Sequence, residues 1–135
     1  MANGTIAFDT LTTSDSVKSG TEKSVDTSYI YNGVTKVWFR LTGVSTASLD
    51  DSLNVSSFND EGTGNYKVTY TNNMNNITYS YSNGVGWDVG GTNSTFNGTD
   101  KDEILTSTLE IYHVNASDSA TDANLSMGSI HGDLA

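Results

Sequence analysis

The feature that most constrains the fold is an acidic, glycine-rich turn at residues 59–64, flanked by two segments in which apolar and polar residues alternate. The alternating apolar residues are Val37, Phe39 and Leu41 before the turn, and Tyr66, Val68 and Tyr70 after it. Successive side chains of a β-strand point to opposite faces, so each set shares one face. Glycine supplies the positive φ that a tight reversal often needs. The pattern therefore predicts strands that cover a common core, with a hairpin at the turn.

The opposite face of the first segment is a candidate contact surface. It carries Lys36, Trp38 and Arg40 beside Val34. The long basic side chains can lie along the indole ring, through their alkyl stems and through cation–π contact. Such a mixture suits a half-exposed surface or contact with another subunit. We therefore take Trp38, Lys36 and Arg40 as the candidate subunit contacts.

Composition favours an all-β domain. The chain has 135 residues, no proline and no cysteine, and only 16% of its residues are charged. Asn, Ser, Thr and Gly are abundant, which disfavours helices and favours short strands with polar turns. This length is enough for one hydrophobic core without disulfides. We expect a single β domain over residues 1–135, in which residues 1–20 can serve as an N-terminal docking strand or arm.

Further strands are expected along the rest of the chain. Together with the two segments above, they are placed near residues 5–11, 24–31, 34–41, 48–57, 66–70, 77–82, 85–89, 105–113 and 125–130. Asn32-Gly33 and Asn83-Gly84 are dipeptides typical of type I′ turns, so each predicts a hairpin. Roughly seven to nine short strands at this spacing are typical of an antiparallel β-sandwich or a jelly-roll-like domain, and no helix is required.

The charge of the chain argues against nucleic-acid and membrane partners. The net charge is −10, and the six basic residues are scattered along the sequence rather than clustered. No apolar run approaches the roughly eighteen residues that cross a bilayer. We expect a soluble, unprocessed chain that binds neither nucleic acid nor membrane.

We expect no catalytic residues, no cofactor and no metal. His113 falls in an expected strand and His131 near the end of the sequence, without the His-x-x-x-His spacing of zinc sites. A Gly-x-Ser-x-Gly nucleophile motif is missing from the sequence. The acidic groups at residues 50–51, 60–61 and 100–103 lack the spacing of calcium loops. Solvated turn charges explain them more simply.

A weak candidate ligand loop surrounds Trp87 and Asp88. Aromatic side chains on exposed strands can stack on sugar rings, and acidic and amide side chains lie nearby in the sequence. Packing in the core or against another subunit is the simpler role, because Tyr and Trp also anchor interfaces. This loop is the basis for a carbohydrate-binding alternative.

One part of the chain, residues 34–81, carries a longer pattern. Its matching positions are Lys36, Trp38, Phe39, Ser52, Asn54, Val55, Ser56, Ser57, Asp60, Gly62, Thr63, Gly64, Tyr66 and Val68. This pattern resembles a short β domain found in tail-fibre and other virion structural proteins of tailed bacteriophages, marine phages among them. The chain departs from it at Asn75, where proline commonly follows the methionine, and at Arg40, where a neutral residue is usual.

The resemblance implies a virion structural role, as a homotrimer, and no catalytic residues. We therefore expect a non-enzymatic phage protein, a trimeric β-domain of a tail fibre or spike on the particle surface, made in the bacterial host cytoplasm. One alternative is capsid decoration, as a head fibre or cement protein. A second is a carbohydrate-binding module for host recognition. The expected partners are copies of itself, capsid or tail proteins and, in the second alternative, a host surface glycan.

Overall fold

The computed structural model of the chain describes residues 10–12, 24–86 and 95–135. The chain divides into two compact units, Met1–Val34 and Thr35–Ala135. In the first unit, β1 (Thr10–Thr12) pairs with β2 (Ser24–Asp26) in antiparallel orientation, and helix α1 (Thr27–Gly33) follows β2 directly. The remainder of the expected docking arm and of the expected strand at residues 5–11 lies outside the described residues.

Helix α1 corrects two expectations: the strand at residues 24–31 and the hairpin at Asn32-Gly33. Asp26 is the N-cap, and its carboxylate accepts a hydrogen bond from the backbone N–H of Ser28 at 2.8 Å. Such a cap satisfies a backbone donor that the first helical turn would leave unpaired. Tyr29 and Tyr31, which the alternation placed on one strand face, are 74% and 53% exposed. The expectation of a fold without helix was wrong because local capping outweighed β-propensity.

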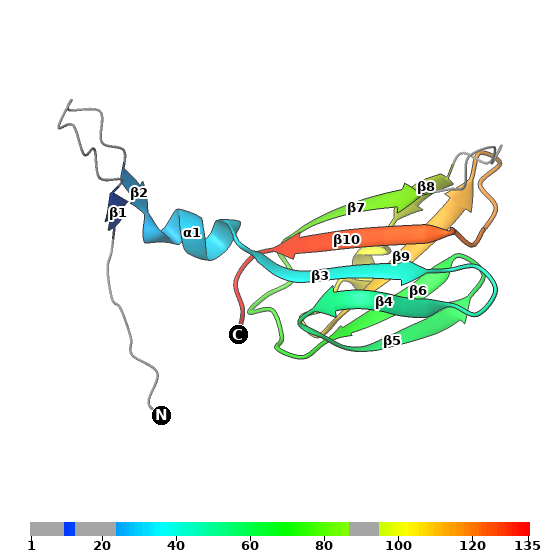
Figure 1. Ribbon diagram of the computed structural model, residues 1–135, viewed down its shortest axis with the longest axis horizontal. Coiled ribbons are helices and arrows are strands. Elements are labelled where there is room, and N and C mark those ends of the chain that lie inside the picture. Colours follow the sequence, from blue (N-terminus) through cyan, green and yellow to red (C-terminus); the bar gives the residue numbers. More distant parts are fainter. Residues whose placement is uncertain (1–9, 13–23, 87–94) are drawn as a thin grey trace. The chain divides into compact units, whose positions relative to one another are not determined.

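In the second unit, the described strands form two four-stranded antiparallel sheets that pack face to face as a sandwich (Figure 1). The first, called the front sheet below, has the order β4-β3-β10-β7 and consists of β3 (Thr35–Thr42), β4 (Ser48–Leu53), β7 (Ser80–Gly86) and β10 (Leu125–His131). The second, called the back sheet, has the order β5-β6-β9-β8 and consists of β5 (Val55–Gly62), β6 (Asn65–Tyr70), β8 (Thr95–Gly98) and β9 (Thr108–Asn115). The short 3₁₀ helix η1 (Lys101–Glu103) lies between β8 and β9 in sequence. The expected antiparallel β-sandwich is thereby confirmed.

The core lies between the two sheets and follows strand alternation. Its buried residues are Val37, Phe39, Leu41, Tyr66, Val68, Tyr70, Met74, Leu109, Ile111 and Ile130. The two apolar faces expected around the glycine-rich turn are therefore confirmed, and the turn joins β5 to β6 in antiparallel pairing. Gly64 has a φ of +67°, and a Cβ there would lie 2.5 Å from the carbonyl oxygen of His113. Glycine is required at this position for both reasons.

Asn54 divides the segment expected as one strand at residues 48–57. Its φ of +59° turns the chain from the front sheet to the back sheet, and its side-chain oxygen accepts a hydrogen bond from the backbone N–H of Asn72 at 2.8 Å. Strands β4 and β5 therefore belong to different sheets. Within β4, Asp50 is an extra residue opposite β3 and forms a bulge. The bulge reverses the alternation, so that Leu53 leaves the core face and is 48% exposed.

The hairpin expected at Asn83-Gly84 is not formed. Strand β7 continues through both residues and pairs with β10, with Gly84 opposite Met127. A neighbouring strand that offers partners along the whole segment outweighs a local turn preference. The expected continuation at residues 87–89 lies outside the described residues. The last two expected strands are confirmed as β9 and β10, although β9 begins only at Thr108.

Candidate functional site

The outer face of the front sheet carries the three residues expected as subunit contacts. Lys36, Trp38 and Arg40 alternate with the buried residues of β3, so they point away from the core. Lys36 and Trp38 are half-buried, and Arg40 is exposed. Strand pairing places Leu53 of β4 on one side of Trp38 and Ser129 of β10 on the other. The structure therefore brings all three onto one surface, and their role as contacts stays a prediction.

The charges on this face balance one another. Arg40 lies opposite Asp51, and its Nε is 3.4 Å from the carboxylate of Asp50, which also accepts a hydrogen bond from the Thr42 hydroxyl at 3.2 Å. The arginine side chain is 58% exposed, so water screens the pair and its contribution to stability is roughly 0–1 kcal/mol. The basic residues of this face are Lys36 and Arg40, and the acidic ones are Asp50 and Asp51. The face is therefore balanced, although the whole chain has a net charge of −10.

The β7–β10 half of the same face is hollowed. A shallow depression of about 290 Å³ is lined by Ser82, Asn83, Gly84, Met127, Gly128 and Ser129. It is shallow and open because small residues occupy the outward positions of β7. Met127 borders it and is 42% exposed. The depression therefore lies beside an apolar side chain on an uncharged part of the sheet.

Sequence reasoning missed Leu53 and Met127 as surface residues. Met127 lies three positions before the buried Ile130 in the same strand, so alternation would have placed the two side chains on opposite faces. Leu53 offered no such signal, because its orientation depends on the bulge at Asp50. Both apolar side chains extend the surface on which Trp38 lies.

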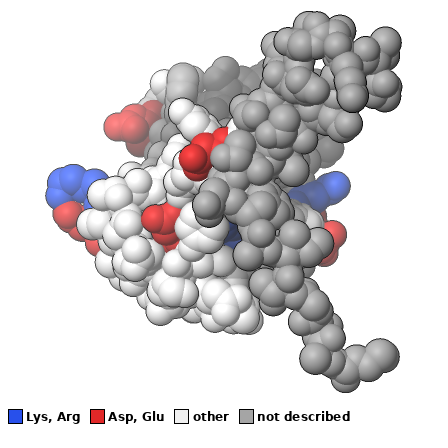
Figure 2. Space-filling view, turned by 90° about the vertical axis from the view of Figure 1, so that its left-hand side faces the viewer, with Lys and Arg blue, Asp and Glu red and all other residues white. Residues whose placement is uncertain are grey.

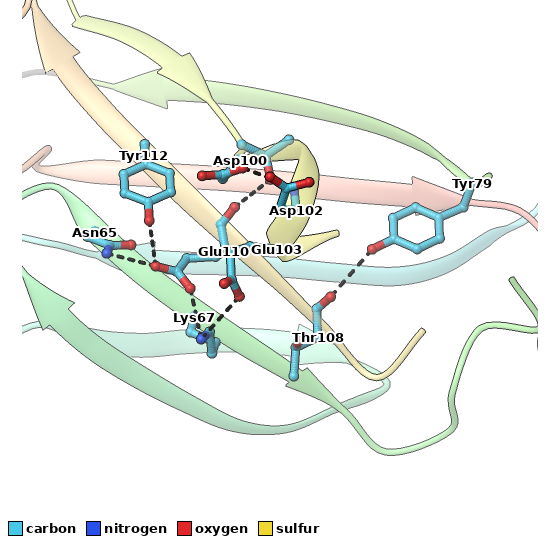
Figure 3. Close-up of polar contacts among 10 residues, drawn as sticks. Asn65, Lys67, Tyr79, Asp100, Asp102, Glu103, Thr108, Glu110 and Tyr112 are labelled. Carbon is cyan, nitrogen blue, oxygen red and sulfur yellow. Dashed lines mark hydrogen bonds and ion pairs between the residues drawn. The ribbon is translucent and has the colours of Figure 1, made fainter. Parts of the chain in front are cut away.

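The outer face of the back sheet has a different character, because it is polar and partly covered by the chain itself (Figure 3). Glu110 on β9 is only 6% exposed. Its carboxylate accepts hydrogen bonds from Lys67 Nζ at 2.8 Å, from Asn65 Nδ2 at 2.8 Å and from the Tyr112 hydroxyl at 2.7 Å. Glu103 of η1 adds a second carboxylate 3.5 Å from Lys67 Nζ.

This polar cluster is built to hold charge rather than to move protons. The hydrogen bond from Lys67, helped by those from Tyr112 and Asn65, lowers the pKa of Glu110 to about 2 despite its burial. The same hydrogen bond raises the pKa of Lys67. At neutral pH the carboxylate is therefore ionised and already has three donors. The cluster connects β6, β9 and η1, and at neutral pH its Glu110 carboxylate has no proton to donate and is only a weak base.

The buried histidine joins the two sheets. His113 on β9 is fully buried, and its Nε2 lies 3.1 Å from the hydroxyl oxygen of Ser126 on β10, which is fully buried as well. Burial lowers the pKa of His113 to about 4, so the ring is neutral at neutral pH. A serine hydroxyl without access to solvent cannot attack a substrate. The other histidine, His131, lies 3.4 Å from the hydroxyl of Thr35.

The acidic groups considered as calcium ligands make local contacts. Asp60 accepts a hydrogen bond from the backbone N–H of Gly62 at 3.0 Å, and Asp100 accepts one from that of Asp102 at 2.9 Å, which caps η1. Within residues 10–12, 24–86 and 95–135, no group of three or more His, Asp or Glu side chains is placed to hold a metal ion. Trp87 and Asp88, the weak candidate ligand loop, lie outside the described residues.

The surface drawn in Figure 2 shows how the described charges are distributed. Acidic and basic side chains are scattered over this face, and the described residues form no continuous basic area on it. A basic area of that kind is the usual footprint of nucleic-acid binding. Among the described residues, no helix is long and apolar enough to span a membrane.

Comparisons with known proteins provide no relative for this chain. No family model, no curated protein and no solved structure matches it. The surfaces described above and the sequence pattern of residues 34–81 are therefore the features that bear on its function.

Proposed function

We propose that this protein is a non-enzymatic structural component of a tailed-phage virion, a trimeric β-domain of a tail fibre or spike on the particle surface. The observation that carries the proposal is the outer face of the front sheet, where the exposed Leu53 and Met127 and the half-buried Trp38 lie together beside balanced charges. Exposed apolar residues that gather on one face and are rimmed by polar ones mark interaction surfaces. The virion setting comes from the phage-like pattern of residues 34–81, which contributes Trp38 to this face.

A structural role also agrees with the state of the titratable residues. Glu110 is ionised and fully hydrogen-bonded, and His113 is neutral and buried between the sheets. General acid–base catalysis requires a group near its pKa at the working pH and within reach of the substrate. Neither residue meets both requirements. These residues instead connect strands: Glu110 contacts β6, and His113 on β9 contacts Ser126 on β10.

The proposal is tested by immunogold labelling of intact phage particles with an antibody to this chain. Label along the tail is the expected result, and mass spectrometry of purified particles should find the chain in a fixed ratio to the other virion proteins. Label over the head would replace the tail placement by capsid decoration. If purified particles carry neither label nor the chain, the structural role is wrong.

A further inference from the structure

The two outer faces of the sandwich differ in how they are covered. Over the back sheet, the segment around η1 folds onto the strands: Thr99 donates a hydrogen bond to the Glu110 carbonyl at 2.6 Å, and Glu103 reaches Lys67. On the front sheet, by contrast, Leu53 and Met127 remain 48% and 42% exposed. Of the large hydrophobic side chains described as exposed, the two that lie in strands of the sandwich, Leu53 and Met127, both belong to the front sheet.

The front face also combines a ridge and a hollow. Its β3–β4 half carries two large side chains at paired positions, Trp38 and Leu53. Its β7–β10 half carries Gly84 and serines around the depression of about 290 Å³, with Met127 at the border. A face with a raised half and a hollowed half can pack against a second copy if the ridge of one copy enters the hollow of the other. In such a contact, each copy offers its ridge to one neighbour and its hollow to another, so it can bind two neighbours at once.

The charges on the front face allow a second copy of the same chain to dock there. Two chains of net charge −10 repel one another over most of their surface. On the front face, Lys36 and Arg40 balance Asp50 and Asp51, so two copies meet there with little repulsion. Interfaces are commonly arranged so that the facing charges are complementary or neutral.

We propose that the outer face of the front sheet is the contact between copies of this chain, with the β3–β4 half of one copy packed on the β7–β10 half of the next. Contacts of this head-to-tail kind close into a ring when the rotation between copies closes, and otherwise extend into a filament; a closed ring is the expected assembly here. That the ring has three members rests on the proposed function, whereas the choice of face rests on the geometry alone. Trp38 is the central anchor, since buried tryptophans carry a large share of the energy at interfaces.

The test is the mass of the purified full-length chain, measured by light scattering over a concentration series. The wild type is expected to have three times the chain mass. Leu53→Lys and Met127→Lys each place a charge in the contact, and each should weaken association by roughly tenfold or more. The matched control is Leu105→Lys, because Leu105 is 43% exposed and precedes β9 of the back sheet. The control should keep the wild-type mass.

A double variant examines the head-to-tail arrangement. Leu53→Lys combined with Met127→Glu sets an introduced lysine of one copy near an introduced glutamate of the next, so it should associate more tightly than Leu53→Lys alone. Circular dichroism and thermal unfolding confirm that each variant is folded, as expected for substitutions at exposed positions. Failure of the double variant to recover association would overturn the ridge-to-hollow arrangement.

Two other results would overturn the choice of face: a wild type that is monomeric at all concentrations, and an oligomer that Leu53→Lys and Met127→Lys leave unchanged. Particle labelling is scored separately. A monomer that still labels virions refutes this inference and the trimeric state, and leaves the virion role of the proposed function standing. A ring that is missing from virions refutes the proposed function and leaves the interface standing.

Discussion

Acid should weaken the sandwich through His113, the histidine that bridges the two sheets. Its ring is fully buried, and its Nε2 makes the 3.1 Å contact with Ser126. Burial lowers the pKa of His113 to about 4, against an ordinary value of 6.5, and the charge of Asp122 opposes this shift only in part. Between these two values, the unfolded chain binds a proton that the folded chain excludes. Stability is therefore complete above pH 6.5 and falls as the pH decreases towards 4.

The size of the effect follows from the shift. A difference of one pH unit in pKa corresponds to about 1.4 kcal/mol, so the whole shift of His113 corresponds to about 3 kcal/mol. About 2 kcal/mol of this loss falls between pH 7 and pH 4.5. The lowered pKa of Glu110, about 2, acts in the same direction, but its window lies below the ordinary value of 4.5. Above pH 4.5 the loss of stability therefore comes mainly from the histidine.

The assay is urea unfolding at several pH values from 7 down to 4.5, for the wild type, His113→Gln and the control His131→Gln. The wild type and the control should lose about 2 kcal/mol over this range, and His113→Gln should be less stable at pH 7 but much less dependent on pH. Because His113→Gln can prove too unstable to measure, the NMR titration of the His113 ring in the wild type provides a second readout. A wild-type stability that does not change between pH 7 and 4.5, or a ring that titrates near pH 6.5, would refute the reasoning.

Two further predictions concern packing and charge, and urea unfolding checks both. Gly128→Ala should lower the free energy of unfolding by roughly 1–3 kcal/mol, because a Cβ there would lie 2.2 Å from a ring carbon of Phe39. Gly84→Ala is the control. The atom nearest to its Cβ would lie at 3.9 Å, so it should change stability by less than about 0.5 kcal/mol. Equal effects would show that the close approach at Gly128 is relaxed. Glu110→Gln should cost roughly 1–3 kcal/mol, because Lys67 loses its main partner. Glu103→Gln removes the longer and more exposed ion pair of Lys67, so it should lower the free energy of unfolding by less than about 1 kcal/mol. A larger loss for Glu103→Gln than for Glu110→Gln would contradict the assignment of Glu110 as the main partner of Lys67.

The core faces of the strands could be predicted because alternation is a local property. Phe39 and Val68 are buried for the same reason that made them recognisable: each stands two positions from other apolar residues in a strand. The outward direction of Trp38 followed from the same periodicity. The reversal at residues 62–64 was equally readable, because the positive φ values needed there favour glycine.

Other elements were misjudged because a competing interaction decided them. The capping bond of Asp26 starts a helix where alternation indicated a strand. Asn83-Gly84 looked like a turn, yet β10 lies beside it and pairs with the continuous strand β7. At Asn54, a hydrogen bond to a residue far along the chain, Asn72, accompanies the crossing between sheets. The pairing of β7 and the crossing at Asn54 both depend on partners that are distant in sequence.

The candidate site shows the same division. The sequence by itself determined that β3 has a wet face with Trp38 between two basic residues, because side-chain direction in a strand depends only on position. Only the tertiary structure decided what lies beside that face. The bulge at Asp50 turns Leu53 outward, and the pairing of β10 with β7 sets Met127 beside a hollow. Strand order and register arise from contacts between segments far apart in the chain, which local periodicity does not encode.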